Sequence, residues 1–445
     1  MELHYCVPVW GERYVSVLTD VSMPSLLAEG NLPALAEVCD VRFRIFTRSA
    51  DAGLIRSSPI WRRFTGRIRT DIVPCDHLDL SQTYGGMSNL LREAIRQAAA
   101  AGAAFVPQAA DGFWSDGSFR TLGRLLRAGK RLVLCGGVRV TMESFVPAIL
   151  RDHVRPDGSV ALSGQELVGL AIDHMHPSFA SSLTDGRLRP EAPSHWLRPC
   201  GERSFIQTIF HAVPLVVVGT GYECGFNGTI DRGFVETLGL AETEIAMIGS
   251  SDDLMLVDIA RARRFLGRAR LDPAPDAVVT GRWFHEQGEQ HALHGGRFLA
   301  RAIRCRGSDR PGEAADLARA ARQSRRAAMD GLAVAEMLAA ARALRQVGRT
   351  DLGAELTAAA LGGRLSLSVA RLRPYRAFLP AEAAELRLLL SGTGAERLAD
   401  RILPGTGAAA GVMEGRSLGG GTLPALQVVG GPVDTGLGQL YLVDR

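Results

Sequence analysis

Short apolar runs alternate with helix-like segments along the first 140 residues of the chain. The apolar runs end at Gly, Pro or Asp, which is typical of strands, whereas the longer segments are rich in Ala, Leu and Arg, which is typical of helices. This order predicts a mainly parallel α/β sheet flanked by helices and joined by right-handed crossovers. The predicted strands are residues 3–9, 42–47, 71–74, 103–109 and 131–135, and the predicted helices are 88–101, with Ser88 as its N-cap, and 118–128.

The middle of the chain has a less regular pattern. Residues 213–218 are the most β-branched stretch and residues 244–248 are a second apolar run, so both predict strands, whereas residues 254–266 favour a helix. Another predicted helix, 163–172, leads into Asp173-His174-Met175-His176. These two histidines lack the further ligand spacing of a zinc site, and a metal-binding, a substrate-binding and a structural role stay open.

The composition changes near residues 307–312, where Ser-Asp-Arg-Pro-Gly predicts a linker. Ala, Leu and Arg dominate residues 313–361, which predicts two or three helices separated at Asp330-Gly331 and at Gly348. Residues 404–438 are rich in Gly and indicate loops, followed by a short apolar end. We therefore expect an α/β domain at 1–306, a helical region at 307–403 and a Gly-rich C-terminal tail at 404–445.

Composition narrows the class of protein. The chain has 445 residues, of which 46% are hydrophobic and 22% charged, as in a globular protein. Its 51 basic and 47 acidic residues nearly balance, so no nucleic-acid partner is indicated. No apolar stretch reaches the ~18–20 residues of a transmembrane segment. The seven cysteines are scattered without CxxC pairs, which predicts free thiols, and without a secretory leader the expected location is the cytoplasm.

Acidic residues on turns after predicted strands are the main candidates for chemistry. Asp111 directly follows the predicted strand at 103–109, and Asp116 lies on the next Gly- and Ser-rich turn. Carboxylate oxygens at a strand end are suitable ligands for Mg²⁺ or Mn²⁺, which would neutralise a diphosphate. The structural alternative is that Asp111 forms a turn with Gly112 and that Asp116 caps the following helix.

Three later segments carry further candidates. Gly136-Gly137 would let the backbone approach a ligand, and Arg139 would bind a phosphate or carboxylate; the alternative is a tight turn with a surface arginine. Asp231 lies on one acidic turn, and Asp252 and Asp253 lie together on another. Each of these three acids is either a general base or an acceptor-binding acid, or the cap of a helix.

Four short segments, taken together, resemble a known family. They are Val7-Pro-Val-Trp-Gly11, Met23-Pro-Ser-Leu-Leu-Ala-Glu-Gly-Asn31-Leu-Pro-Ala-Leu35, the strand at 43–47, and Ala110-Asp111-Gly112. Their order resembles that of bacterial GT-A-type glycosyltransferases, which use nucleotide-sugar donors, and the resemblance covers residues 1–265. It implies a GT-A-like α/β domain followed by an α-helical C-terminal region.

The resemblance also implies roles for individual residues. Pro8, Trp10 and Gly11 would lie at the nucleotide, and Asp111 would be the first acid of a DXD motif that binds metal and diphosphate. This chain departs from the motif, because Asp111-Gly112-Phe113 has no second acid at the expected spacing and Asp116 comes later. Arg139 would stabilise phosphate charge. The base of an inverting enzyme would be one of the three later acids.

The expected reaction is transfer of a sugar from a nucleotide-sugar donor to a glycan, protein or small-molecule acceptor, with Mg²⁺ or Mn²⁺ as cofactor. Two alternatives stay open. One is another nucleotide-using transferase or a hydrolase on a similar sheet. The other is a catalytically degenerate, transferase-like binding or scaffold protein that recruits a protein partner through its helical region, which the incomplete DXD motif favours.

Overall fold

The structure is a computed structural model, and it divides into two compact units, each built from separate stretches of the chain. Unit 1 comprises Met1–His176, Ala212–Ala262 and Cys305–Asp309; unit 2 comprises Pro177–His211, Arg263–Arg304 and Arg310–Arg445. The chain therefore leaves and re-enters unit 1, unlike the expected linear division at residues 306 and 403. The residues that the structure describes are 1–81, 83–184, 188–190, 195–209, 213–218, 238, 240–263, 268–271, 280–281, 302–346, 348, 350–361, 427–428, 433–434 and 439–444.

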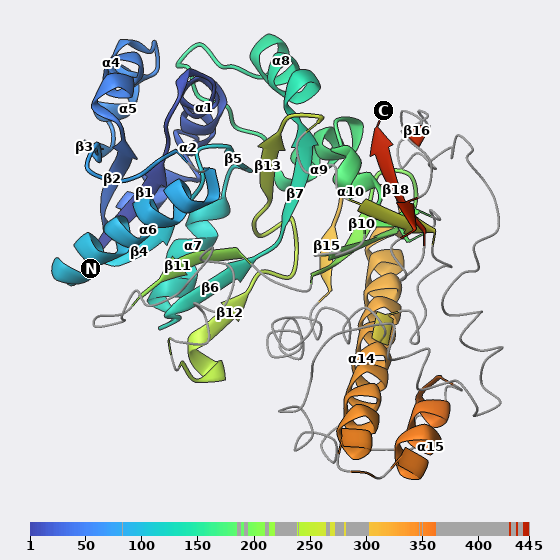
Figure 1. The fold of residues 1–445 in the computed structure, drawn as a ribbon. Helices are drawn as coiled ribbons and strands as arrows, with labels where there is room; N and C mark the ends of the chain where they lie inside the picture. The colour runs from blue at the N-terminus through green and yellow to red at the C-terminus, as the bar shows by residue number, and fades with distance from the viewer. Residues whose placement is uncertain are drawn as a thin grey trace. The chain divides into compact units, whose positions relative to one another are not determined.

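Unit 1 is built around a seven-stranded sheet with the strand order β12-β6-β11-β4-β1-β2-β3 (Figure 1). Neighbouring strands are parallel, except that β11 runs antiparallel to both β4 and β6. The prediction of a mainly parallel sheet flanked by helices is therefore confirmed. The strands are β1 (Glu2–Pro8), β2 (Asp40–Thr47), β3 (Arg69–Pro74), β4 (Ala104–Pro107), β6 (Leu132–Cys135), β11 (Val213–Val217) and β12 (Ile245–Met247).

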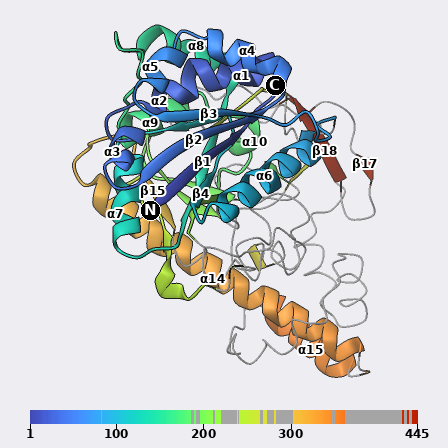
Figure 2. The same cartoon turned by 90° about the vertical axis from the view of Figure 1, so that its left-hand side faces the viewer.

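The alternating side chains of β1 explain how helices cover this sheet. Leu3, Tyr5 and Val7 are buried in the larger core, and the Tyr5 and Phe43 rings stack with their centroids 5.0 Å apart. Cys6 points to the other face, into a smaller core with α6 (Thr83–Ala100), which lies along the sheet in Figure 2. The larger core is closed by α1 (Glu12–Val17), α2 (Met23–Leu26), α3 (Leu32–Ala36), α4 (Ser49–Ser57), α5 (Trp61–Thr65) and α7 (Ser118–Arg127).

A second, three-stranded sheet of unit 1 has the order β5-β13-β7, with β5 at Gly112–Trp114, β13 at Leu256–Ala260 and β7 at Gly137–Thr141. The predicted helix at 254–266 is thus wrong for residues 256–260, which form the central strand. Side chains on both faces of β13 are buried, so its sequence is a nearly continuous apolar run that does not alternate, and such a run does not distinguish a strand from a helix. Residues 137–139, for which a tight turn was one of two alternatives, begin β7.

Unit 2 contains the antiparallel strands β9 (His195–Pro199) and β10 (Phe205–Ile209), beside which β15 (Ile303–Cys305) adds a third strand. The Ala-rich segment forms α14 (Glu313–Gln346) and α15 (Thr350–Leu361), which confirms its helical prediction. The expected break at Asp330-Gly331 is wrong, because α14 continues through it. A Cβ on Gly331 would lie 2.6 Å from the Thr280 side chain, so glycine at this position lets Thr280 pack closely against α14.

The remaining elements complete the description. In unit 1 they are a π-helical turn (Leu18–Ser22), α8 (Met142–Asp152), α9 (Gly164–Asp173) and a 3₁₀ turn (Glu242–Glu244). In unit 2 they are α10 (Pro177–Ala180), β8 (Leu188–Pro190), β14 (Arg268–Leu271), β16 (Gln427–Val428), β17 (Val433–Asp434) and β18 (Gln439–Asp444). The α9 helix begins with a capping box between Ser163 and Glu166, close to its predicted start.

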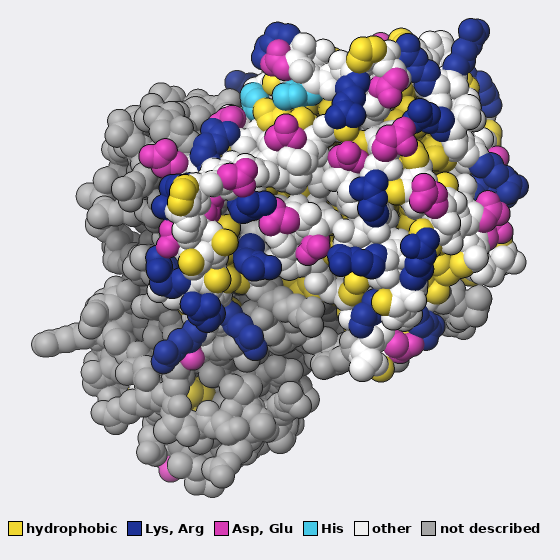
Figure 3. Space-filling model, turned by 180° about the vertical axis from the view of Figure 1, so that it is seen from behind, with side chains coloured by type: hydrophobic (Ala, Val, Ile, Leu, Met, Phe, Trp, Pro, Cys, Tyr) yellow, Lys and Arg dark blue, Asp and Glu magenta, His cyan; other side chains and the backbone are white. Residues whose placement is uncertain are grey.

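Several compositional predictions are answered by the described residues. Within them, no helix combines the length and the apolar character needed to cross a membrane. The face of the molecule in Figure 3 shows arginines interspersed with acidic side chains, in keeping with the nearly balanced charge. Cys224 lies outside the described residues, and the six described cysteines are buried free thiols, as predicted: Cys6, Cys39, Cys75, Cys135, Cys200 and Cys305.

Candidate functional site

The loops after β1 and β4 leave the central sheet at neighbouring points. These two strands are adjacent and parallel; β2 and β3 extend the sheet beyond β1, and β11, β6 and β12 extend it beyond β4. The direction of sheet growth therefore reverses between β1 and β4. In open α/β sheets, ligands bind at the carboxyl ends of the strands at such a switch point. Residues 9–11 and 108–111 lie at this edge.

The loop after β1 is held by Asp51 of α4. The Gly11 N–H donates to the Asp51 carboxylate at 3.0 Å, and the Arg48 guanidinium donates to it at 2.7 and 3.2 Å. Burial alone would raise the pKa of Asp51, but the hydrogen bonds from Arg48 and Gly11 outweigh burial and hold this pKa below its usual value. Gly11 has φ +82°, a conformation that favours glycine, and α1 begins directly after it. Asp51 was not predicted from the sequence, although its spacing from Arg48 within one helical turn was a usable signal.

Pro8 and Trp10 lie on the same loop as Gly11. Pro8 is the last, buried residue of β1, and Trp10 is half-buried. The Trp10 indole packs at the start of α6, where a Cβ on Gly86 would lie 3.2 Å from the ring. The predicted N-cap Ser88 is wrong, because α6 begins at Thr83 and Ser88 is an interior residue of the helix. The three residues expected at the nucleotide are thus brought together at the switch point.

Asp111 lies between β4 and β5 and beside two charged residues of the second sheet. The Ile259 N–H donates to the Asp111 carbonyl at 3.0 Å, which fixes Asp111 against β13. Asp258 of β13 pairs in register with Gly112 on one side and Arg139 on the other, and the Arg139 Nε donates to Asp258 Oδ2 at 2.6 Å. Asp111, Asp258 and Arg139 therefore form one cluster, which we call the Asp111 cluster.

The Asp111 cluster changes the acidity of Asp111. Burial and, after it, the charge of Asp258 raise the pKa of Asp111 to about 7, while the Arg139 guanidinium opposes this shift. A carboxyl group that titrates near neutral pH exchanges its proton easily for a bound cation, or takes part in proton transfer.

Gln108 places an unsatisfied donor at the same edge. Its backbone N–H donates to the Cys6 carbonyl at 3.0 Å, so it lies beside the end of β1. Its side chain is only 5% exposed, and Nε2 has no hydrogen-bond partner in the described part of the chain. A buried donor without a partner costs about 1–3 kcal/mol, so a ligand oxygen would be favoured there. Gln108 was not predicted from the sequence. Its position at a strand end, three residues before Asp111, was a usable signal.

The Met23–Leu35 motif and the preceding Ser22 hold residues 110–119 through hydrogen bonds. The Ser22 hydroxyl donates to the Ala110 carbonyl at 2.7 Å, the Trp114 N–H donates to Ser25 Oγ at 3.3 Å, and the Phe119 N–H donates to Asn31 Oδ1 at 3.3 Å. Ser22 and the polar residues of the motif therefore fix the chain from Ala110 to Phe119 and position Asp111 without belonging to the cluster.

Asp116 is not part of the Asp111 cluster. Its carboxylate accepts the Gly30 N–H at 2.7 Å, and its own N–H donates to the Leu162 carbonyl at 2.7 Å. A Cβ on Gly30 would lie 2.4 Å from the Gly117 nitrogen, so this turn packs directly on the backbone of Gly30. Asp116 thus holds the turn between β5 and α7, and Asp258 is the carboxylate that lies beside Asp111.

Asp252 and Asp253 lie at the opposite end of the β5–β13 ladder. They precede Leu256, which pairs with Trp114, whereas Asp258 pairs with Gly112. Both carboxylates are exposed and ion-paired. Asp252 accepts the Arg306 guanidinium at 3.1 and 3.0 Å, and Asp253 accepts Arg124 at 3.3 Å. The third proposed base, Asp231, lies outside the described residues.

The two histidines of the 173–176 segment have different neighbours. His176 is buried and its Nε2 bonds to the Arg261 carbonyl at 2.8 Å. The His174 ring meets the Phe145 ring edge-on with a centroid distance of 6.0 Å, and burial lowers the pKa of His174. These contacts favour the structural role over a shared metal.

The donor set at Asp111 fits one kind of cation site. In the part of the chain that the structure describes, no three His, Cys, Asp or Glu side chains are grouped so as to hold a metal ion. Mg²⁺ in transferases is commonly bound by one or two carboxylates together with substrate phosphates and water. Asp111 and Asp258 therefore fit a divalent cation that arrives with a diphosphate. Asp258 was missed because its strand was interpreted as a helix.

Comparisons with known proteins give little similarity. No protein-family model matches the chain. No curated protein sequence matches it either. Among solved structures, one match is described as a glucose-1-phosphate thymidylyltransferase from Bacillus anthracis in complex with sucrose, with 15% sequence identity and a TM-score of 0.20. The match covers 31% of this chain and 55% of that chain, so it spans about half of that protein. A similarity of this size assigns no family.

Proposed function

We propose that unit 1 binds a nucleotide sugar at the edge formed by β1 and β4 and transfers its sugar to an acceptor, as GT-A-type glycosyltransferases do. The observation that carries this proposal is the Asp111 cluster beside the switch point. Two neighbouring carboxylates and a guanidinium complement a divalent cation and a diphosphate, which together form the leaving side of a nucleotide sugar.

The nucleoside is proposed to lie against the loop after β1. The half-buried Trp10 indole offers an aromatic face to a base, and Gly11 is fixed in place by Asp51. The buried Gln108 Nε2 would donate to a ribose or phosphate oxygen, which would satisfy a group that lacks a partner in the described structure. These three residues give the nucleoside one apolar wall and one polar anchor.

The diphosphate is proposed to lie at the Asp111 cluster. Asp111 and Asp258 would hold Mg²⁺ or Mn²⁺, whose positive charge would stabilise the departing diphosphate. Arg139 keeps Asp258 oriented through the 2.6 Å hydrogen bond and adds positive charge. Of the three proposed bases, Asp252 and Asp253 are engaged at the far end of the ladder, which leaves Asp231 as the proposed general base.

A second candidate is nucleotide binding without turnover. One observation favours it: Asp258, the partner that the Asp111 cluster offers in place of a second DXD acid, is already ion-paired with Arg139. In that case the site would bind a nucleotide with a weakly held cation, and the helical region of unit 2 would recruit a partner.

Thermal unfolding with nucleotides tests the proposal. UDP, GDP, CMP and dTDP would each be added with and without Mn²⁺. A ligand of the native state at ~100 times its Kd adds about 2.7 kcal/mol of stability, which raises Tm measurably. We expect one nucleotide to stabilise the protein selectively with Mn²⁺, and Asp111→Asn to abolish the effect while Asp116→Asn keeps it.

Incubation with the nucleotide sugar of the stabilising base then separates the two candidates. Release of the nucleoside diphosphate supports transfer, whereas binding without release supports the second candidate. If no nucleotide shifts the unfolding of the wild type, both candidates are wrong.

A further inference from the structure

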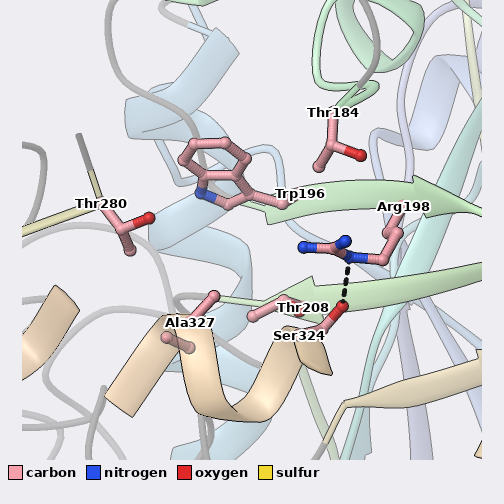
Figure 4. Close-up of a pocket in the computed structure, with 8 residues that line it drawn as sticks. Thr184, Trp196, Arg198, Thr208, Thr280, Ser324 and Ala327 are labelled. Atoms are coloured by element: carbon pink, nitrogen blue, oxygen red, sulfur yellow. Dashed lines mark hydrogen bonds between the residues drawn. The ribbon is translucent and has the colours of Figure 1, made fainter. Parts of the chain in front are cut away.

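Unit 2 contains a cavity between β9, β10 and α14 that has no part in the proposed nucleotide site (Figure 4). The space open to the centres of water-sized molecules is about 30 Å³. Because roughly 10–15 Å³ of such space holds one water, the cavity is of the size of a small polyatomic ion and too small for a nucleotide. Its lining combines the Arg198 guanidinium, the Trp196 ring and several hydroxyl groups.

Strand register and helix spacing create this cavity. Trp196 pairs with Thr208 across the β9–β10 ladder, and Arg198, two residues along, shares their face. At one end of this face Ile206 packs against Leu317 of α14. Two turns further along α14 the helix presents Ser324, and three turns along it presents the small residues Ala327 and Ala328, which leave the space unfilled.

Arg198 lies in this cavity without a counter-charge in the described part of the chain. Its Nε donates to Ser324 Oγ at 3.0 Å, and no carboxylate of the described residues is paired with it. Burial lowers the pKa of Arg198, with no opposing contribution from a neighbouring acid. In Figure 4 the terminal nitrogens of the guanidinium face the space beside Trp196. A half-buried cation of this kind is destabilised unless an anion joins it.

The hydroxyl groups around Arg198 complete an oxyanion site. Thr208, Thr280 and Ser324 are all buried, with 6%, 5% and 6% exposure, and each lines the cavity. A guanidinium fork donates two parallel hydrogen bonds to a phosphate or sulfate, and threonine hydroxyls donate further ones. Thr280 packs on Gly331 of α14 and Gly281 packs on Val334 of the same helix, so the position of Thr280 does not depend on a ligand.

We propose that the Arg198 cavity binds a small oxyanion of the phosphate class, held by the Arg198 guanidinium and by the hydroxyls of Thr208 and Thr280. The oxyanion is either free phosphate or the phosphate group of a larger molecule. This site belongs to unit 2 and does not depend on the nucleotide site proposed for unit 1.

The test is the shift of Tm on adding inorganic phosphate to the full chain at constant ionic strength, with chloride as reference. Saturating phosphate is expected to raise Tm by about 2–4 °C. Arg198→Gln should abolish the rise, and Arg198→Lys, which keeps the charge but loses the fork, should weaken phosphate affinity roughly tenfold. Arg325→Gln removes an exposed arginine one residue from Ser324 and should leave the rise unchanged.

Two further experiments make the test decisive. Arg139→Gln removes the positively charged group of the Asp111 cluster in unit 1, so a rise that survives it does not come from that site. Glycerol phosphate in place of phosphate distinguishes the two sources, because binding of the ester supports a phosphate group on a larger molecule. Absence of any rise with both anions in the wild type, or an equal rise in wild type and Arg198→Gln, would overturn the proposal. If Arg198→Gln does not fold, Arg198→Lys with unchanged affinity would overturn it equally.

Discussion

Arg139 in unit 1 and Arg198 in unit 2 are both half-buried arginines on β-strands, and different groups face them. Arg139 donates to the Asp258 carboxylate at 2.6 Å, whereas Arg198 donates to the Ser324 hydroxyl at 3.0 Å. The first charge is compensated within the fold and orients a carboxylate beside Asp111. The second is compensated by no described residue and is therefore available to an anion. The same residue type thus supports the proposed cation site in one unit and the proposed anion site in the other.

The comparison also shows why composition could not tell which arginines belong to a binding site. Nearly all of the 51 basic residues are arginines, so their abundance marks no site. What separates Arg139 from Arg198 is strand register: β13 brings Asp258 opposite Arg139, whereas β10 brings Ile206 opposite Arg198. The first pairing joins residues 119 positions apart, whereas the second joins two strands that follow each other in the sequence, and neither strand pair was predicted from the local pattern.

Substituting the two arginines should give the largest difference in the free energy of unfolding. Arg139→Met leaves Asp258 unpaired beside Asp111, so we expect the free energy of unfolding to fall by about 1–3 kcal/mol. Arg198→Met removes an uncompensated charge from a similar environment, so we expect a change within about 0.5 kcal/mol in phosphate-free buffer. Urea unfolding of both variants measures this difference. Equal destabilisation by the two substitutions would mean that the arginines have the same electrostatic role.

The two acids of the 111–116 segment allow the next contrast. Asp116→Asn weakens the hydrogen bond to the Gly30 N–H, so we expect the free energy of unfolding to fall by about 1–2 kcal/mol. Because Asp116 is not in the Asp111 cluster, nucleotide binding should be retained at a temperature well below Tm. Loss of binding in a folded Asp116→Asn protein would show that the turn contributes to the site directly.

The pH dependence of unfolding sharpens the assignment of Asp111. Its pKa is raised to about 7 in the folded protein, so between about pH 4 and 7 the folded state binds more protons than the unfolded state. The stability of the wild type should therefore fall as pH rises through this window, by at most about 1.4 kcal/mol per pH unit. Asp111→Asn removes this contribution, so its stability relative to the wild type should increase from pH 5 to pH 8. A difference that is independent of pH would contradict the raised pKa.

The smallest effects are expected at Asp252 and Asp253. Both are in exposed ion pairs, which contribute about 0–1 kcal/mol each. Asp252→Asn and Asp253→Asn should therefore change the free energy of unfolding by less than about 0.5 kcal/mol and leave nucleotide binding unaltered. Equilibrium unfolding and binding of the same samples check both points. A large loss of turnover in either variant would restore that acid as a candidate general base.

Much of the central sheet could be predicted, because its strands are short apolar runs bounded by turn residues. β1, β2 and β6 were expected within one or two residues of their observed bounds. The β13 strand could not be distinguished from a helix, because both of its faces are buried. Asp258 was missed for that reason alone. Asp111 was found from its position at a strand end, and this position needs no knowledge of tertiary contacts.

The pairing of residues within the site depends on tertiary structure. Asp111 and Asp116 are close in sequence, and this closeness alone suggested them as partners, yet β5 lies between them and Asp116 binds the Gly30 N–H instead. Gln108 and Asp51 gained their importance from the ends of neighbouring strands and helices, which only the sheet order brings together. The anion cavity of unit 2 required the register of two strands and the phase of α14, none of which a local pattern contains.

Calorimetric titration of Mn²⁺ together with each nucleoside diphosphate is the most direct test of the Asp111 cluster. It would be carried out on the wild type, on Asp111→Asn and on the matched control Asp116→Asn. The account predicts that the wild type and Asp116→Asn bind one nucleotide with similar Kd values. Asp111→Asn should bind it about 100-fold more weakly, because half of the protein's carboxylate ligands for the cation are lost. Equal binding by the wild type and Asp111→Asn, or no binding by any of the three proteins, would contradict the account.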